Sequence, residues 1–312
     1  MGRRVRVESA GLVLVYLGLG VVSGLLWARL ADLPRLPSWH AEMVGGYAPA
    51  PNQYRPLTPW VAQLLRWLLP GGSPVAAYVV LRSLVTGIAL LSFDRYMRVW
   101  FSPAAAAAGA MCLAAIIPFT YFRVVQESDP LNLLVFVLAF WALAVGRDRL
   151  VPPLVLVGTL NRETTALLPA VYLLARWREA PAQRVVGMTV VLAGAWAVPY
   201  GAMLVAYGSR AYYCDVVTFW QNVGSWAGTA LLLALYGAMW ALSLLGARDG
   251  PRVLRRALWL LPPYLALHYV IALVWEVRLF LPFAPVVIPL AWWVLFPEER
   301  REAARPAARL EH

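Results

Sequence analysis

The stretch VPPLVLVGTLNRETTALLPAVYLLAR, residues 151–176, holds two apolar runs on either side of the polar residues Asn161, Arg162 and Glu163. Each run has about ten residues, or roughly 15 Å of helix, whereas the hydrocarbon core of a bilayer is about 30 Å thick. Neither run can cross a membrane alone. We therefore expect the segment to enter and return as two short arms. Its polar residues should then sit at membrane depth, in a cavity lined by protein or filled with water.

Apolar runs long enough to span a membrane recur along the rest of the chain. The 312 residues are 61% hydrophobic and 14% charged, whereas about a quarter of the residues in a soluble protein are charged. We expect an all-α, polytopic transmembrane helical bundle. It should form one domain over 1–297, followed by an arginine-rich tail over 298–312 that ends in a tag-like Leu-Glu-His. The expected spans are roughly 9–31, 74–93, 103–122, 131–146, 184–206, 225–246, 257–275 and 279–296.

Arginine-rich turns separate these spans, and with the two-arm segment in place they all fall on one side. They are Arg3/Arg4/Arg6, Arg95/Arg98, Arg147/Arg149, Arg176/Arg178/Arg184, Arg252/Arg255/Arg256 and Arg300/Arg301/Arg305/Arg309. The positive-inside rule makes this side cytoplasmic, with the N-terminus inside. The net charge of +11 therefore does not indicate nucleic acid, since no basic face with interleaved aromatics stands apart from the spans. We expect an integral protein of a bacterial or archaeal plasma membrane.

A second set of polar residues mixes acids with single arginines and falls on the opposite, outer side. Its members are Glu42 with Tyr54 and Arg55, Arg123 with Glu127 and Asp129, Asn161 with Arg162 and Glu163, Asp215, and Glu276 with Arg278. The segment 58–69 is too short to span and predicts a helix in the interface beside them. Carboxylates and guanidiniums gathered at a membrane surface suggest one polar site for chemistry on a charged, lipid-borne substrate.

Four segments carry a resemblance to a known family. They are AEMVGGY at 41–47 with QYRPL at 53–57, ESDPLNLL at 127–134, GTLNRETTALLP at 158–169, and EVRLFLPFAP at 276–285. Together they resemble GT-C membrane glycosyltransferases, including the mannosyltransferase-like branches, over roughly 40–300. Two features depart from the family pattern. The first loop offers Asp32 and Glu42 without the usual acidic neighbours, and the sequence lacks the usual carboxy-terminal soluble domain.

The resemblance implies that a sugar moves from a polyprenyl-phosphate-linked donor in the membrane lipid to a lipid, glycan or protein acceptor outside, with inversion. A carboxylate would take the proton of the acceptor hydroxyl. The catalytic candidates are Glu42, Glu127 and Asp129, and Glu42 is preferred because nearby arginines explain Asp32. Arginines would hold the donor phosphate. The substrate-binding candidates are Tyr54, Arg55, Arg123, Asn161, Arg162, Glu163, Glu276 and Arg278. We expect no cofactor or metal site, although Glu127 and Asp129 are compatible with a divalent cation.

Other interpretations stay open. Glu127 and Asp129 would also cap the span that begins at Pro130, and Arg162 with Glu163 would also form a structural ion pair. A broken arm with charges at depth is typical of transporters, including flippases of lipid-linked or anionic solutes, but no internal repeat of spans is visible. An inert GT-C relative that acts as a scaffold is a third interpretation. No motif indicates a membrane protease or phosphatase.

Overall fold

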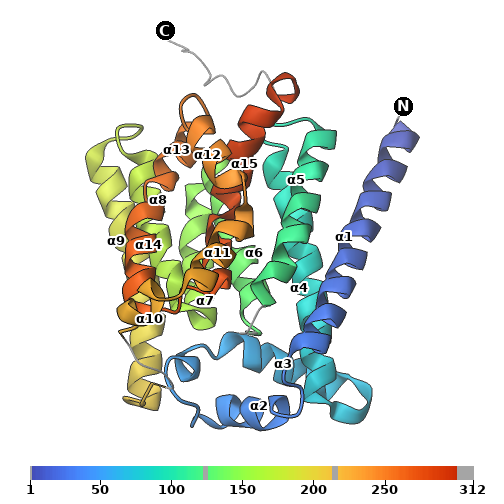
Figure 1. Cartoon of the computed structure of the whole chain (residues 1–312), viewed down its shortest axis with the longest axis vertical. Coiled ribbons are helices and arrows are strands. Elements are labelled where there is room, and N and C mark those ends of the chain that lie inside the picture. The colour runs from blue at the N-terminus through green and yellow to red at the C-terminus, as the bar shows by residue number, and fades with distance from the viewer. Residues whose placement is uncertain (1, 122–125, 213–216, 301–312) are drawn as a thin grey trace.

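The structure, a computed structural model, describes residues 2–121, 126–212 and 217–300, with residues 2–9 described by their backbone alone. Helices account for nearly all the regular structure of these residues (Figure 1). They are α1 (Gly2–Leu30), α2 (Leu36–Gly45), α3 (Leu57–Leu68), α4 (Pro74–Met97), α5 (Pro103–Ile116), α6 (Asp129–Ala144), α7 (Val151–Asn161), α8 (Leu167–Arg176), α9 (Ala182–Tyr207), α10 (Phe219–Val223), α11 (Trp226–Tyr236), α12 (Met239–Gly246), α13 (Arg252–Leu258), α14 (Leu261–Ile271) and α15 (Ala284–Leu295). Short 3-10 helices that matter below are η1 (Asn52–Tyr54), η3 (Ile117–Tyr121), η5 (Glu163–Ala166) and η6 (Val277–Phe283).

Five helical segments within the described residues are long and apolar enough to cross a membrane. They are Ala10–Leu30, Pro74–Met97, Pro103–Tyr121, Ala182–Tyr207 and Val277–Leu295. These match the spans predicted near 9–31, 74–93, 103–122, 184–206 and 279–296. The predicted span at 131–146 is α6, which has 16 residues and is a shorter apolar helix. The chain is thus a helical membrane protein, as its composition predicts.

Two of the predicted spans are not continuous helices in the structure. The run 225–246 is split into α11 and α12, which are bent by 56° at a break that contains Gly237. Gly237 has a φ of +50°, a backbone conformation that side chains with a Cβ rarely adopt. The run 257–275 is split into α13 and α14, and Pro262 lies in the first turn of α14, where its ring cannot continue a preceding helix.

The segment 151–176 does return to the end of the bundle at which it starts. Arg176, the last residue of α8, donates from Nε to Asp148 Oδ2 at 3.0 Å, just before α7 begins. The middle of the segment lies at the other end of the bundle, against α3, where Thr58 donates to Asn161 Oδ1 at 2.6 Å. Gly158 permits close packing of α7, because a Cβ there would lie 2.8 Å from Val135 of α6. The two-arm geometry therefore follows from contacts at both of its ends.

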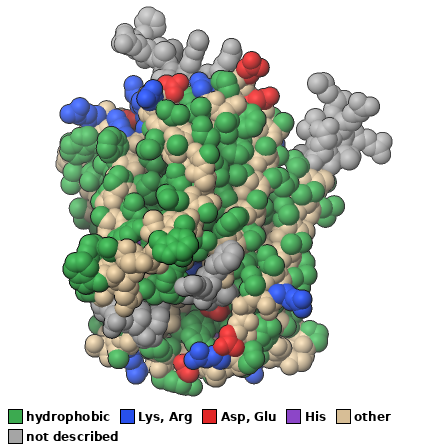
Figure 2. Space-filling view, viewed as in Figure 1, with side chains coloured by type: hydrophobic (Ala, Val, Ile, Leu, Met, Phe, Trp, Pro, Cys, Tyr) green, Lys and Arg blue, Asp and Glu red, His purple; other side chains and the backbone are tan. Residues whose placement is uncertain are grey.

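Charged side chains gather at the two ends of the molecule and leave an apolar band between them (Figure 2). One end, called here the arginine-rich end, carries both termini of the described chain and the ion pairs Arg176–Asp148, Arg256–Glu179 and Arg300–Asp249 (Figure 1). Helices α2 and α3 lie across the opposite end. The core centres on α15, most of whose residues are buried, whereas α9 exposes most of its apolar side chains. An apolar exterior of this kind suits contact with lipid.

The helix predicted over 58–69 is present as α3. Its buried face carries Thr58 and Ala62, and its exposed face carries Trp60, Leu64 and Trp67. A twelve-residue helix of this kind suits the surface of a bilayer better than its interior. Its position across the end of the bundle sets one boundary of the site described next.

Candidate functional site

Arg162 is the buried charge at the turn between the two arms. Its extended backbone (φ −163°, ψ 134°) ends α7, and its side chain is only 1% exposed. Nη1 of Arg162 donates to Oδ1 of Asp129, the first residue of α6. A guanidinium buried without a counter-ion would cost several kcal/mol, so the acid at the start of α6 is what allows Arg162 to be charged there. Nε of Arg162 has no acceptor among the described residues.

Arg278 reaches the same carboxylate from η6. Its Nη1 lies 3.5 Å from Asp129 Oδ1 and donates to Gln126 Oε1 at 2.8 Å. Its Nη2 donates to Glu276 Oε2 at 2.9 Å. Asp129 therefore lies between two guanidiniums that are 33 and 149 positions further along the chain. Charge-assisted bonds of this kind fix the position of both arginines.

Arg55 closes the network from the first loop. It follows η1, and its Nε donates to Glu163 Oε2 at 2.7 Å while Nη2 pairs with Oε1 of the same carboxylate. This two-bond fork is the geometry that a guanidinium shares with carboxylates and phosphates. Arg55 Nη1 also donates to Gln126 Oε1 at 3.2 Å. The amide of Gln126 thus accepts from both Arg55 and Arg278, and it joins the first loop to η6.

These groups form one wall of a cavity of about 400 Å³, the arginine cavity. Its polar wall is lined by Arg55, Arg162, Glu163, Glu276 and Arg278. The facing wall is largely apolar and comes from α14 and α9, with Tyr264, Leu267, Ile271 and Tyr200. The Tyr200 ring is held by stacking on Trp196 at 5.2 Å. One cavity thus offers fixed cations to an anionic group and an apolar wall to hydrocarbon or to a sugar face.

A second cavity of about 430 Å³ lies beside the first and carries mostly acids; it is called here the acidic cavity. Asp32, Glu42 and Glu127 line it together with Arg35. Asp32 and Arg35 form an exposed pair at 3.9 Å. Glu42 and Glu127 form no ion pair with any residue of the described ranges. The two cavities therefore differ in how their charges are compensated.

Glu127 is the acid of this region whose pKa is raised toward neutral pH. It lies in the loop before α6, and its burial raises the pKa of the carboxyl to about 7. The guanidiniums of Arg82 and Arg278 oppose this rise. A carboxyl with a pKa near 7 can accept and release protons at neutral pH, which is the property required of a general base.

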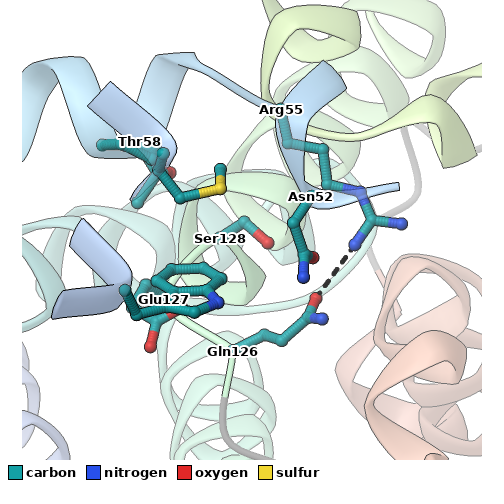
Figure 3. A pocket seen from close by; sticks show the side chains of 9 residues that line it. Asn52, Arg55, Thr58, Gln126, Glu127 and Ser128 are labelled. Carbon is teal, nitrogen blue, oxygen red and sulfur yellow. Dashed lines mark hydrogen bonds between the residues drawn. The ribbon is translucent and has the colours of Figure 1, made fainter. Parts of the chain in front are cut away.

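A narrow slot of about 10 Å³ separates the two cavities, and its lining includes Asn52, Arg55, Gln126, Glu127 and Ser128. The bond from Arg55 to Gln126 crosses one side of this slot, and the carboxylate of Glu127 lies on the other side (Figure 3). The side chain of Asn52 lies between them. The wall between the cavities is therefore made of side chains, which can move more readily than backbone.

The structure divides the residues predicted for the site. Arg55, Arg162, Glu163, Glu276 and Arg278 line the arginine cavity, whereas Glu42 and Glu127 line the acidic cavity. Asp129 lies behind the arginine cavity as a counter-ion. Asn161 ties the turn to α3 and to the Ser128 carbonyl, and the Tyr54 hydroxyl donates to Gly208 O at 2.9 Å. Arg123 and Asp215 lie outside the described residues.

A divalent cation held by Glu127 and Asp129 does not fit this arrangement. The Asp129 carboxylate is engaged by Arg162 and Arg278, and two adjacent cations would repel a metal ion. The described ranges contain no group of three His, Cys, Asp or Glu residues placed to hold a metal.

Sequence reasoning missed Gln126 and did not include Arg82 among the site candidates. Arg82 is buried in α4, stacks over Tyr121 at 4.5 Å and donates from Nη1 to the Gln126 carbonyl at 3.1 Å. The signal available was the rule that a charge inside an apolar span needs a partner. Gln126 is uncharged and follows no pattern, so only its neighbours at 127 and 129 point to it.

Comparison with protein-family models, curated proteins and solved structures finds no match for this chain.

Proposed function

We propose that this protein is a GT-C-type glycosyltransferase that takes a sugar from a polyprenyl-phosphate-linked donor. The observation that carries the proposal is the arginine cavity itself, in which guanidiniums held in place by acids lie opposite an apolar wall. Arg55, Arg162 and Arg278 line this cavity, and each is fixed by at least one carboxylate. Fixed guanidiniums of this kind suit the phosphate of a phosphodiester, which accepts paired, charge-assisted hydrogen bonds.

The two walls of the cavity suit the two parts of such a donor. Its phosphate would lie against Arg278 and Arg162, whose positions are already fixed, so little reorganisation accompanies the release of the leaving phosphate. Its polyprenyl chain would follow the apolar wall of α14 toward the lipid. The stacked rings of Trp196 and Tyr200 would face the sugar, as aromatic rings commonly do in sugar sites. The acceptor hydroxyl would approach from the acidic cavity.

Glu127 is the carboxylate best placed to take the acceptor proton. It lines both the acidic cavity and the slot beside Arg55, whereas Glu42 lines the acidic cavity alone. Asp129 is engaged by Arg162 and Arg278 and lines neither cavity, so it is poorly placed to meet an acceptor hydroxyl. The sequence favours Glu42, and the geometry shifts the assignment to Glu127, with Glu42 as a group that orients the acceptor.

Donor binding and sugar transfer by the purified chain in lipid nanodiscs test this proposal. A radiolabelled polyprenyl-phosphate sugar should bind, and Arg278→Gln should weaken its binding by at least about tenfold, as loss of a charge-assisted phosphate contact does. Arg252→Gln at the arginine-rich end is the matched control and should leave binding unchanged.

Three other results would contradict the proposed glycosyltransferase activity. Binding without transfer to any lipid, glycan or protein acceptor would favour an inert relative. Movement of the intact donor between leaflets without transfer would favour a flippase. Equal binding by Arg278→Gln and the parent chain would remove the arginine cavity as the donor site.

A further inference from the structure

A third cavity, of about 390 Å³, lies at the arginine-rich end, far from the site described above. Its walls come from the end of α12, from α13 and from the start of α14. Most of its lining is apolar, with Leu244, Ala247, Leu258, Leu261 and Pro262. The exposed residues Leu244 and Trp259 lie on it as well, at 63% and 74% exposure. An apolar hollow that opens beside exposed apolar side chains suits contact with lipid chains.

Two arginines give this apolar cavity a positive charge, and they differ in how they are used. Arg256 donates from Nη1 to the carbonyls of Ala175 and Trp177 at 2.9 and 2.6 Å and pairs with Glu179 at 3.3 Å. Arg256 therefore holds α13 against the end of α8, and its charge is compensated.

Arg255 forms far fewer contacts with the protein than Arg256 does. Within the described ranges its guanidinium gives one hydrogen bond, from Nη1 to the Arg248 carbonyl at 3.0 Å. Its Nε is buried without an acceptor, and it forms no ion pair with a described acid. A guanidinium carries five N–H donors. Most of those of Arg255 are thus left for a ligand at the edge of the cavity.

We propose that this cavity binds an acidic phospholipid of the leaflet at the arginine-rich end. The phosphate would accept from Arg255, and an acyl chain would fill the apolar hollow lined by Ala247, Leu258 and Leu261. Trp259 would lie at the level of the headgroups, where indole rings are favoured. Arginine is suited to phosphate because its fork matches two phosphate oxygens. Acidic lipids are attracted to basic groups at a membrane surface. This site does not depend on the proposed glycosyltransferase activity.

Native mass spectrometry of the delipidated, full chain tests the proposal. Phosphatidylglycerol and phosphatidylcholine with the same acyl chains are titrated separately, and the dissociation constant of the first bound lipid is compared. We expect phosphatidylglycerol to bind at least about tenfold more tightly, from charge-assisted bonds to a phosphate with a net negative headgroup. Arg255→Gln should remove this preference. Arg252→Gln, which removes the same charge from an exposed position on the same helix, should keep it.

A second variant tests the apolar half of the site. Ala247→Phe fills the hollow without a change of charge, and it should also abolish the tight phosphatidylglycerol site. This variant decides the question if Arg255→Gln fails to fold. Retention of the preference in Ala247→Phe would overturn the proposal, and so would an equal loss in Arg252→Gln. Displacement of the lipid by millimolar glycerol 3-phosphate would also overturn it, because the site would then be one for a soluble phosphate.

Discussion

The arginine cavity and the acidic cavity lie on either side of one wall, yet their charges are handled in opposite ways. In the arginine cavity, Arg55, Arg162 and Arg278 each form at least one ion pair with a nearby acid. In the acidic cavity, Glu42 and Glu127 have no such partner among the described residues. Ion pairs hold charged groups in position, whereas burial raises the pKa of Glu127 to about 7, so this carboxyl can change its protonation near neutral pH. The first arrangement suits binding and the second suits proton transfer.

Among the substitutions that test this difference between the cavities, we expect the largest effect on sugar transfer from one at Glu127. Glu127→Gln keeps the shape of the side chain and removes its ability to accept a proton. We expect sugar transfer to fall by at least about a hundredfold, since general base catalysis contributes roughly 10²- to 10⁴-fold, with donor binding nearly unchanged. Single-turnover assays with labelled donor measure the first quantity and equilibrium binding measures the second.

Glu42→Gln is the matched control, because it makes the same change on another wall of the same cavity. It should reduce transfer less than Glu127→Gln does. The reverse result, with transfer lost in Glu42→Gln and kept in Glu127→Gln, would return the role of base to Glu42, as the sequence alone favours.

The ion-paired groups of the arginine cavity are tested most directly by a substitution of Arg162. Arg162→Met removes the closer of the two counter-ions that the described residues offer to buried Asp129, and Arg278, at 3.5 Å, is the other. We expect a loss of stability of about 3–5 kcal/mol, the typical cost of removing one partner of a buried ion pair. The thermal midpoint in detergent should fall accordingly, and Asp129→Asn in the same chain should recover part of it.

Arg184→Met, which removes an exposed arginine at the start of α9, is the control and should be almost neutral. An unchanged midpoint in Arg162→Met would mean that the Asp129 charge is compensated from elsewhere, and that Arg162 is not a fixed part of the cavity.

The pH dependence of sugar transfer tests the role of Glu127 in the acidic cavity. A base works in its deprotonated form, and the pKa of Glu127 is raised to about 7. Transfer per enzyme at low donor concentration should therefore be constant above about pH 8 and fall as the pH drops through 7. At pH 5.5 it should be about thirtyfold lower, from the fraction of the carboxyl that remains ionised. The fall should disappear in Glu127→Gln. A profile with its midpoint near 4.5 would assign the step to a carboxyl with an ordinary pKa.

Much of the fold follows from hydropathy and length, because long apolar helices are stable in lipid wherever the sequence supplies them. The two-arm segment follows from the same arithmetic, since ten residues cannot cross about 30 Å. The breaks inside 225–246 and 257–275 do not follow from it. A hydropathy average counts Gly237 and Pro262 as ordinary members of an apolar run. In the structure the helices break next to both residues, because of their backbone conformations.

The site divides in a similar way. Arg162, Glu163, Glu276 and Arg278 are predictable because a charge at membrane depth needs a partner. The separation into two cavities is not predictable, because the wall between them is built from side chains of distant segments. Arg55 and Gln126, which are bonded across it, are 71 positions apart. Such a contact depends on how the helices pack, and no periodicity or spacing in the sequence predicts it. The sequence therefore predicts which charges matter more reliably than which of them share a cavity.

The smallest expected effect comes from the cation of the acidic cavity itself. The Arg35 and Asp32 side chains are 85% and 61% exposed, and their closest nitrogen and oxygen are 3.9 Å apart. Solvent and salt screen a pair of this kind, so Arg35→Gln should change stability by less than about 1 kcal/mol and transfer by only a few-fold. The same substitution at Arg55 breaks a bidentate pair whose guanidinium is buried, and it should cost several times more in both measurements. Thermal unfolding and transfer assays on the two variants, at low and at high salt, measure both effects. Because the same Arg→Gln substitution is made in each cavity, the results can be compared directly. If Arg35→Gln were as damaging as Arg55→Gln, the acidic cavity would depend on its own cation, and its carboxylates would belong to a paired network like the one across the wall.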